Sequence, residues 1–134
     1  MAVNSQEEVL KKKTFKRFIH SFSYAYQGMK YAFYHEVNIF VMIIMALIAI
    51  ILGILLHINY VEALVVTLLI GTILSLEMIN CSIEATVDLV TKEKKELAKI
   101  AKDCASGAVF LMSLFSVIIG IMIYVPKILE FIKR

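Results

Sequence analysis

The sequence is poor in the residues that mark disulfide-rich, multidomain and zinc-binding proteins. It has no tryptophan, one proline and five glycines, and it contains no Gly/Ser-rich linker. Its two cysteines are too few for a disulfide framework and form no C-x-x-C motif. The three histidines lack metal-ligand spacing, and the glycine-rich phosphate loops of soluble nucleotide-binding proteins and kinases are missing. We therefore expect one domain over residues 1–134, without a disulfide framework, a zinc site or a glycine-rich phosphate loop.

Long hydrophobic runs dominate the chain, of which 60% is hydrophobic. Residues 39–56 contain no polar side chain over 18 positions, and about 17–25 apolar residues suffice to cross a bilayer as a helix. The pattern predicts an all-α integral membrane protein with spans at 37–57, 61–90 and 104–125. The single proline, Pro126, is expected to end the third span.

The N-terminal third has a different pattern. Residues 1–13 are polar and are expected to fray. Residues 14–35 place aromatic and aliphatic side chains on one broad helical face and lysine, arginine and glutamine mainly elsewhere. A helix with this pattern and modest hydrophobicity is typical of the membrane interface, so we predict an amphipathic interfacial helix there.

Lysine and arginine predict the orientation. Residues 1–35 carry six of them, residues 57–60 none, residues 91–103 five and the C-terminal tail three. Positively charged connections favour the cytoplasmic side of a membrane. The N-terminus and the second connection are therefore predicted to be cytoplasmic and the C-terminus outside.

Four polar side chains lie late in the second predicted span, in LEMINCSIEATVDLV. At 100° per residue, Glu77, Asn80, Glu84 and Asp88 fall within about 80° of one helix face. Carboxylates at membrane depth cost ~2.5–3.5 kcal/mol each, so they occur mainly where they face protein, water or a cation. A solvated helix end accounts for Asp88 and partly for Glu84, but poorly for Glu77, which lies among apolar residues. Such a face suits a magnesium–polyphosphate complex, because Mg²⁺ takes one or two carboxylates and completes its shell with phosphate oxygens and water.

Other segments add charges at a similar depth. Glu36 and Asn38 lie at the start of the first span, and Lys102 and Asp103 precede the third. Lysine binds phosphate as a point charge, although a lysine at a membrane boundary is more often a topology anchor.

The segments LEMINCSIEATVDLV and LAKIAKDCASGAV together resemble the prokaryotic diacylglycerol kinase family, and the resemblance covers about residues 15–125. It implies a homotrimer with active sites at the cytoplasmic membrane surface, each built from more than one subunit. It also implies ATP, with Mg²⁺, and a lipid alcohol as substrates.

The resemblance also implies roles for individual residues. Glu77 matches the catalytic base that takes the proton from the lipid hydroxyl, and Glu36 and Glu84 match the acids that hold the magnesium. The matched ATP-binding positions are Arg17, Tyr24, Glu36, Asn80, Glu84, Glu93, Lys94, Lys95, Lys102 and Asp103. The matched lipid-binding positions are Arg17, Ser21, Tyr26, Glu77 and Ser106.

The family divides into diacylglycerol kinases and undecaprenol kinases. The long motif, the lysine-rich cytoplasmic parts and the absence of tryptophan resemble the undecaprenol kinase branch of Gram-positive bacteria. We therefore expect the protein to phosphorylate undecaprenol in the bacterial inner membrane. We expect membrane lipids as its partners, and no nucleic acid. Three alternatives remain open: a diacylglycerol kinase, a small cation-coupled transporter, since intramembrane acids also mark transporters, and a non-enzymatic subunit of a membrane assembly.

Overall fold

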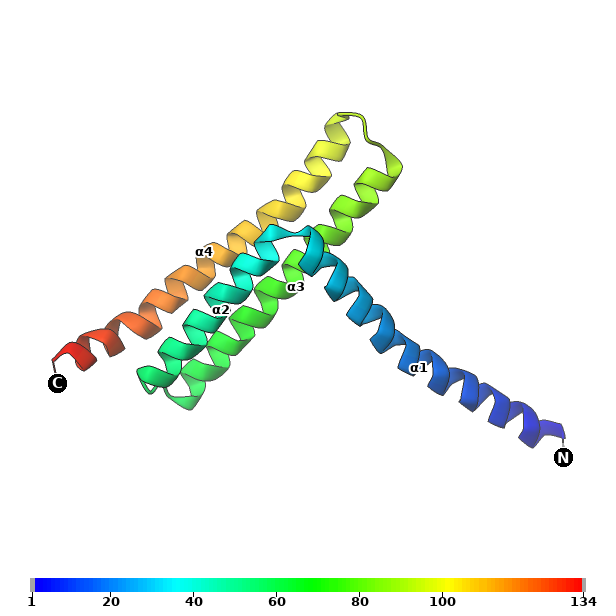
Figure 1. Cartoon of the computed structure of the whole chain (residues 1–134), viewed down its shortest axis with the longest axis horizontal. Coiled ribbons are helices and arrows are strands. Elements are labelled where there is room, and N and C mark those ends of the chain that lie inside the picture. Colours follow the sequence, from blue (N-terminus) through cyan, green and yellow to red (C-terminus); the bar gives the residue numbers. More distant parts are fainter. Residues whose placement is uncertain (1, 134) are drawn as a thin grey trace. The chain divides into compact units, whose positions relative to one another are not determined.

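The computed structural model describes the backbone of residues 2–133 and the side chains of residue 14 and of residues 16–133. Within this part of the chain the helices are α1 (Ala2–His35), α2 (Val37–Leu55), α3 (Tyr60–Val90) and α4 (Glu96–Ile132) (Figure 1). The chain forms two compact units, residues 1–35 and residues 36–134. Helix α1 makes up the first unit and helices α2 to α4 the second, and each is described by itself.

Helix α1 begins earlier than the sequence predicted. The expected helix covered residues 14–35 with a frayed start, whereas the observed helix begins at Ala2. The first turns contain no glycine or proline and are rich in glutamate, glutamine, leucine and lysine, which are strong helix formers. Further along, aromatic side chains stack one turn apart, as Tyr31 does on His35 with ring centroids 4.1 Å apart.

Two capping motifs form the tight turn between α2 and α3. His57 adopts a positive φ of 50°, and the Ile58 N–H donates to the Gly53 carbonyl at 3.1 Å, which is a Schellman-type end for α2. The next helix starts with a capping box: the Glu62 N–H donates to Asn59 Oδ1 at 3.0 Å, and the Asn59 N–H donates to Glu62 Oε2 at 2.7 Å. The chain therefore reverses direction within a few residues.

Helix α4 corrects the prediction that Pro126 ends the third span. It begins at Glu96 and continues through Pro126 to Ile132. A proline inside a helix removes one N–H and crowds the preceding turn, but membrane helices tolerate it because their surroundings satisfy the freed groups. Around this proline, Tyr124 Oη donates to the Ala49 carbonyl of α2 at 2.8 Å, and Lys127 forms an ion pair with Glu62 of α3 at 3.4 Å. These contacts hold α4 on its neighbours on both sides of the proline.

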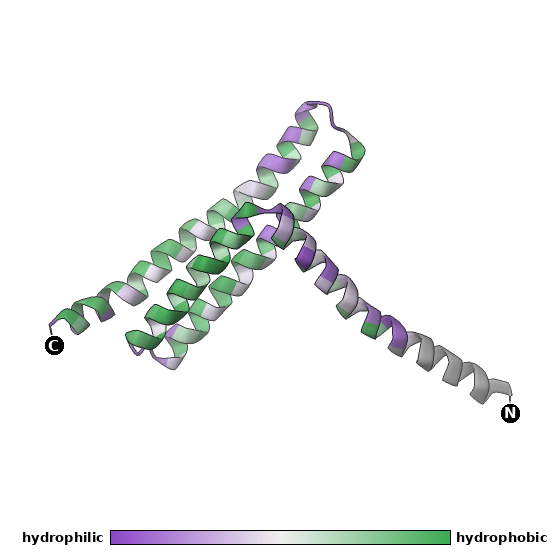
Figure 2. Ribbon diagram, viewed as in Figure 1, coloured by the Kyte–Doolittle hydropathy of each residue, from purple (hydrophilic) through white to green (hydrophobic). Residues whose placement is uncertain are grey.

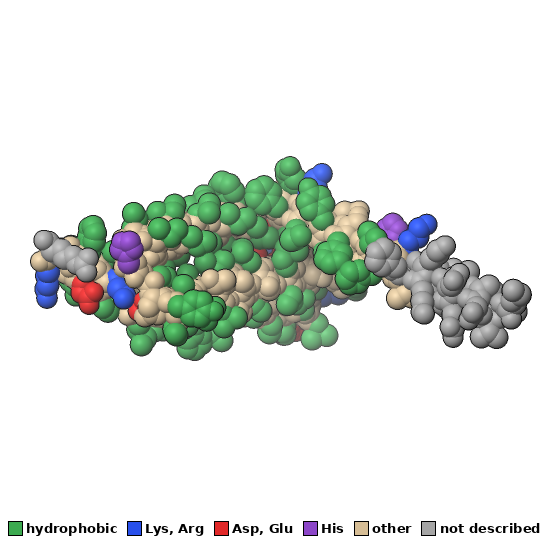
Figure 3. All heavy atoms as spheres, turned by 90° about the horizontal axis from the view of Figure 1, so that it is seen from below, with side chains coloured by type: hydrophobic (Ala, Val, Ile, Leu, Met, Phe, Trp, Pro, Cys, Tyr) green, Lys and Arg blue, Asp and Glu red, His purple; other side chains and the backbone are tan. Residues whose placement is uncertain are grey.

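Helices α2, α3 and α4 are each long and apolar enough to cross a membrane. Figure 2 shows hydrophobic residues along most of their length and hydrophilic residues at the α3–α4 connection. Most of their large apolar side chains are exposed, and in the view of Figure 3 apolar side chains cover most of the visible surface of these helices. A surface of this kind needs lipid or other apolar groups around it.

Helix α3 is the centre of this unit. It packs against both α4 and α2. Helices α3 and α4 continue beyond the start of α2 and are joined by residues 91–95 (Figure 1). The buried apolar residues at these contacts are small or β-branched, namely Ile39, Val66, Cys81, Ala105 and Val109. Small side chains allow membrane helices to approach closely.

Candidate active site on helix α3

A buried carboxyl group lies a little past the middle of α3. Glu77 is only 1% exposed, and its Oε1 atom has no hydrogen-bond partner among the described residues. Glu77 is 17 residues from Tyr60, which corresponds to about 26 Å along the helix, against a hydrocarbon core of about 30 Å. With Tyr60 taken as one boundary of the hydrocarbon core, the carboxyl group falls near the other boundary, on the side of the α3–α4 connection.

The other polar residues of α3 continue from Glu77 toward that connection. Asn80 is 4% exposed and donates from Nδ2 to Glu84 Oε1 at 3.1 Å, while its own Oδ1 is buried without a partner among the described residues. Glu84 is half-buried and Asp88 exposed. The unbroken helix from Tyr60 to Val90 confirms the single face on which the sequence placed these residues.

The start of α2 adds two more polar groups. Glu36, the N-cap residue of α2, makes no capping hydrogen bond with its own helix. Its carboxylate and that of Glu84 both lie close enough to Glu77 to repel its charge, and the Asn38 side chain lies beside the Glu77 carboxyl. We call Glu36, Asn38, Glu77, Asn80 and Glu84 the acid cluster.

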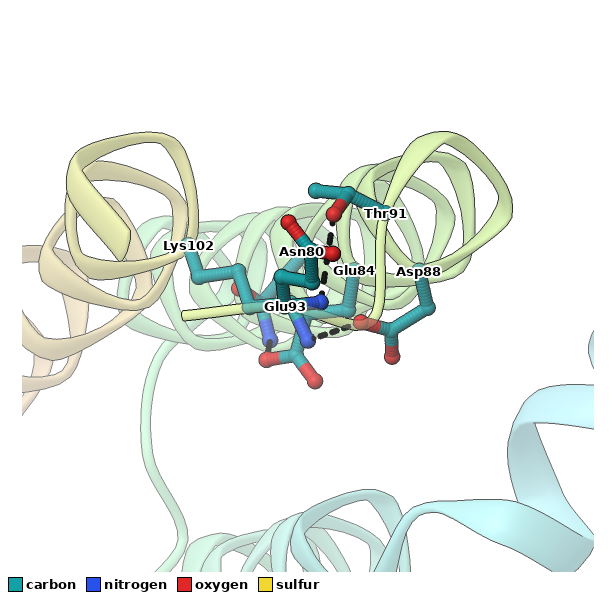
Figure 4. Close-up of polar contacts among 6 residues, drawn as sticks. All are labelled: Asn80, Glu84, Asp88, Thr91, Glu93 and Lys102. Carbon is teal, nitrogen blue, oxygen red and sulfur yellow. Dashed lines mark hydrogen bonds and ion pairs between the residues drawn. The ribbon is translucent and has the colours of Figure 1, made fainter. Parts of the chain in front are cut away.

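A lysine of α4 connects the acid cluster to the polar connection. Lys102 Nζ lies 2.6 Å from Asp88 Oδ1, and its positive charge also lies near Glu84 (Figure 4). Its sequence neighbour Asp103 forms an ion pair with Lys99, one turn earlier. Lys102 and Asp103 thus make separate contacts, and Lys102 is the one that crosses to α3.

The connection itself surrounds a cavity of about 670 Å³. Residues 91–96 line it together with the facing ends of α3 and α4. The cavity brings together five of the residues that the sequence assigned to ATP: Glu93, Lys94, Lys95, Lys102 and Asp103. Thr91 shapes the loop, since its Oγ1 accepts a hydrogen bond from the Glu93 N–H at 3.1 Å (Figure 4).

The remaining predicted site residues lie elsewhere. Arg17, Ser21, Tyr24 and Tyr26 are exposed on α1, in the other compact unit, where Ser21 Oγ donates to the Arg17 carbonyl at 2.9 Å. Ser106 is exposed on α4. Their meeting with the acid cluster stays a prediction.

The described side chains do not form a closed metal cage. Among them, no three histidine, cysteine, aspartate or glutamate residues are arranged to hold a metal ion. Magnesium differs from zinc in this respect, because it commonly takes one or two carboxylates together with substrate phosphates and water.

Comparison with known proteins decides the family. The sequence profile described as prokaryotic diacylglycerol kinase matches residues 23–124. The chain belongs to the prokaryotic diacylglycerol kinase family. It is therefore a membrane-bound lipid kinase, which confirms the predicted enzyme class and does not support the transporter alternative.

Several curated relatives are similar over most of the chain. An undecaprenol kinase of Bacillus subtilis is 40% identical over 112 residues, which are 84% of this chain and 91% of the relative. A diacylglycerol kinase of Synechocystis is 38% identical over 111 residues, or 82% of this chain and 63% of the relative. A diacylglycerol kinase of Helicobacter pylori is 37% identical over 98 residues, or 73% of this chain and 77% of the relative.

Sequence reasoning missed one feature of this site. It explained Asp88 as part of a solvated helix end, whereas Asp88 is the partner of Lys102. Cys81 lies buried beside Glu36. Its i+4 spacing from Glu77 places both side chains on one face of α3.

Proposed function

We propose that the protein transfers the γ-phosphoryl group of ATP to undecaprenol at the cytoplasmic surface of the bacterial inner membrane. The observation that carries this proposal is the buried Glu77 carboxyl with an unpartnered oxygen at the membrane boundary. A lipid hydroxyl reaches this depth from the bilayer, and the charged α3–α4 connection lies a few turns away on the aqueous side. The similarity to the undecaprenol kinase of Bacillus subtilis supports the choice of lipid.

Glu77 acts as the general base. The hydroxyl oxygen of the lipid attacks the γ-phosphorus, the bond from that phosphorus to the β–γ bridging oxygen breaks, and ADP leaves. The hydroxyl proton passes to the Glu77 carboxylate. Phosphoryl transfer depends mainly on positioning and charge neutralisation, so the base works together with the residues that hold the nucleotide.

Glu36 and Glu84 would hold the magnesium of MgATP, which neutralises phosphate charge when bound. The fit rests on two half-buried carboxylates of neighbouring helices that both lie close to Glu77. The Glu36 side chain makes no capping bond with its own helix, and the Cys81 thiol lies beside it. Asn80 holds Glu84 through its amide, which leaves the Asn80 carbonyl oxygen for the nucleotide side.

Lysines of the connection serve the phosphates. Lys102 lies between Asp88 and Glu84, and Lys94 and Lys95 line the same cavity. We assign the nucleotide to this cavity, together with Glu93, Asp103 and, from α1, Arg17 and Tyr24. Ser21, Tyr26 and Ser106 border the lipid headgroup.

The assembled enzyme is a homotrimer with shared sites. Three thin spans cannot enclose a nucleotide and a lipid at once, so a further subunit completes each site. Helix α1 lies in the membrane interface with its aromatic residues toward the lipid. The distribution of lysine and arginine favours a cytoplasmic N-terminus and an external C-terminus, and one domain spans residues 1–134.

Diacylglycerol is the second candidate substrate, because curated relatives from Synechocystis and Helicobacter pylori are diacylglycerol kinases. A competition assay separates the two. Undecaprenol and diacylglycerol are reconstituted at equal mole fraction with purified protein and MgATP, and both lipid phosphates are quantified. We expect more undecaprenyl phosphate than phosphatidic acid. An excess of phosphatidic acid would mean that diacylglycerol, and not undecaprenol, is the preferred substrate.

A further inference from the structure

The last turns of α4 extend beyond the rest of the helical unit. Lys127 forms its ion pair with Glu62 in the first turn of α3, so the two helices are level at this point. Helix α4 then continues to Ile132, past the turn that joins α2 to α3 (Figure 1). This extension is about 8 Å long at 1.5 Å per residue, and it lies outside residues 23–124, which the family profile matches. We call residues 127–133 the tail.

The tail has an apolar side and a charged side. Its apolar residues are Ile128, Leu129, Phe131 and Ile132, and its charged residues are Lys127, Glu130 and Lys133. At 100° per residue the apolar side chains fall within about 160° of the helix circumference, and the centre of the charged side lies about 180° from theirs. A helical segment divided in this way, with aliphatic and aromatic residues on one side and lysine on the other, is typical of a membrane interface.

The apolar side of the tail is not covered by the helical unit. The exposed fraction rises along it, from 37% at Ile128 to 73% at Ile132. Lys127 faces α3 through its ion pair, and the centre of the apolar side is turned about 120° away from Lys127 around the helix. Exposed apolar surface of this kind marks contact with a membrane or with another protein.

The membrane boundary falls where the tail begins. Residues 104–126 of α4 contain no charged side chain over 23 positions, which corresponds to about 35 Å of helix against a hydrocarbon core of about 30 Å. The Lys127–Glu62 ion pair follows directly. Pro126 has no N–H to donate to the Met122 carbonyl, and helices kink at such positions, so the tail can tilt from the axis of the span toward the membrane plane.

We propose that the tail is an interfacial anchor, which lies in the headgroup region of the leaflet remote from the acid cluster. Its apolar side contacts the acyl chains and continues the lipid-facing surface of α4, and its charged side faces water. A second copy of the chain fits this side less well, because a stable protein interface takes about 20–30 residues from each partner, whereas the apolar side of the tail has four. The proposal goes beyond the kinase activity and does not depend on it.

The absence of tryptophan from the chain makes a direct test possible, since one introduced indole is then the only one in the protein. Ile132→Trp places it near the centre of the apolar side. Glu130→Trp is the matched control, because it lies only about 3 Å away along the axis but about 160° around the helix. Both full-length proteins are reconstituted in vesicles of phosphatidylcholine and phosphatidylglycerol, and the oligomeric mass in detergent checks that each is assembled.

Two quenchers then report the surroundings of each indole. Lipids brominated on the acyl chain next to the headgroup should quench Ile132→Trp severalfold more strongly than Glu130→Trp, and the emission of Ile132→Trp should be shifted to the blue. Iodide, added on both sides of the membrane, should show the reverse order. Adding Leu129→Glu to Ile132→Trp places a charge on the apolar side, so it should raise iodide quenching toward the level of Glu130→Trp.

Three results would overturn the anchor. Equal and strong iodide quenching of Ile132→Trp and Glu130→Trp would mean that the tail projects into water. Protection of Ile132→Trp from both iodide and the brominated lipids would mean that protein, such as a second copy, covers the apolar side. Unchanged quenching after Leu129→Glu would mean that the apolar side does not hold the tail in place. No kinase assay enters this test, so its result leaves the proposed function untouched.

Discussion

Replacing Glu77 by glutamine removes the proposed base and almost nothing else. The side chain keeps its size and its hydrogen-bonding capacity, and the site is 1% exposed, so neither packing nor solvent access changes. Because Glu36 and Glu84 repel the Glu77 charge, its removal relieves repulsion within the acid cluster. We therefore expect the thermal midpoint of the detergent-solubilised protein to stay the same or to rise.

The rate of phosphoryl transfer should fall, while the affinities for MgATP and for the lipid stay the same. A positioned general base contributes about 10²–10⁴-fold, which corresponds to about 3–5 kcal/mol of activation free energy. The loss should appear in single-turnover transfer, in which enzyme exceeds labelled ATP and product release does not limit the rate. MgATP and lipid affinities, measured by calorimetry and by lipid titration, should change little.

Glu62 provides the control for this variant. It is an acid in the first turn of the same helix, far from Glu77, and glutamine there preserves the capping box with Asn59. The change also removes the ion pair with Lys127, so the thermal midpoint of this control is measured beside its transfer rate. Glu62→Gln should keep the wild-type transfer rate. A Glu77→Gln protein that transfers phosphate at the wild-type rate would refute the base assignment and leave Glu77 with a lipid-orienting role.

Three further changes separate metal, phosphate and structural roles. Glu84→Gln should weaken MgATP binding and leave the oligomer assembled; unchanged nucleotide affinity by calorimetry would remove Glu84 from the metal site. Lys102→Ala should raise the KM for ATP much more than that for lipid, and the reverse order would reassign Lys102 to the lipid. Tyr124→Phe loses the 2.8 Å bond to Ala49 and should lower stability in a denaturing-detergent titration by about 0.6 kcal/mol; a loss of several kcal/mol would mean that this bond holds α4 in place.

The membrane spans and the polar face of α3 could be predicted because both depend only on the local sequence. Uninterrupted apolar runs set the helices, and the 3.6-residue period brings Glu77, Asn80 and Glu84 together whatever surrounds them. The similar depth of Glu36 and Glu84 also followed from counting residues along two spans. Both carboxylates indeed lie near Glu77.

The pairings between helices could not be predicted, because they depend on the register of α3 against α4. Nothing local in the sequence shows that Lys102 faces Asp88 rather than its neighbour Asp103. The end of α4 was missed for a related reason: Pro126 normally breaks a helix, and only contacts with neighbouring helices, such as that of Lys127 with Glu62, hold α4 together beyond it.

The transfer reaction itself tests the account most directly. Purified protein is reconstituted with undecaprenol in lipid vesicles and given ATP labelled at the γ-phosphate, with and without Mg²⁺, and the label is followed in the lipid and aqueous phases. The account predicts magnesium-dependent appearance of the label in undecaprenyl phosphate, matched by ADP formation. Label found only as inorganic phosphate in the aqueous phase, or no consumption of ATP, would contradict it.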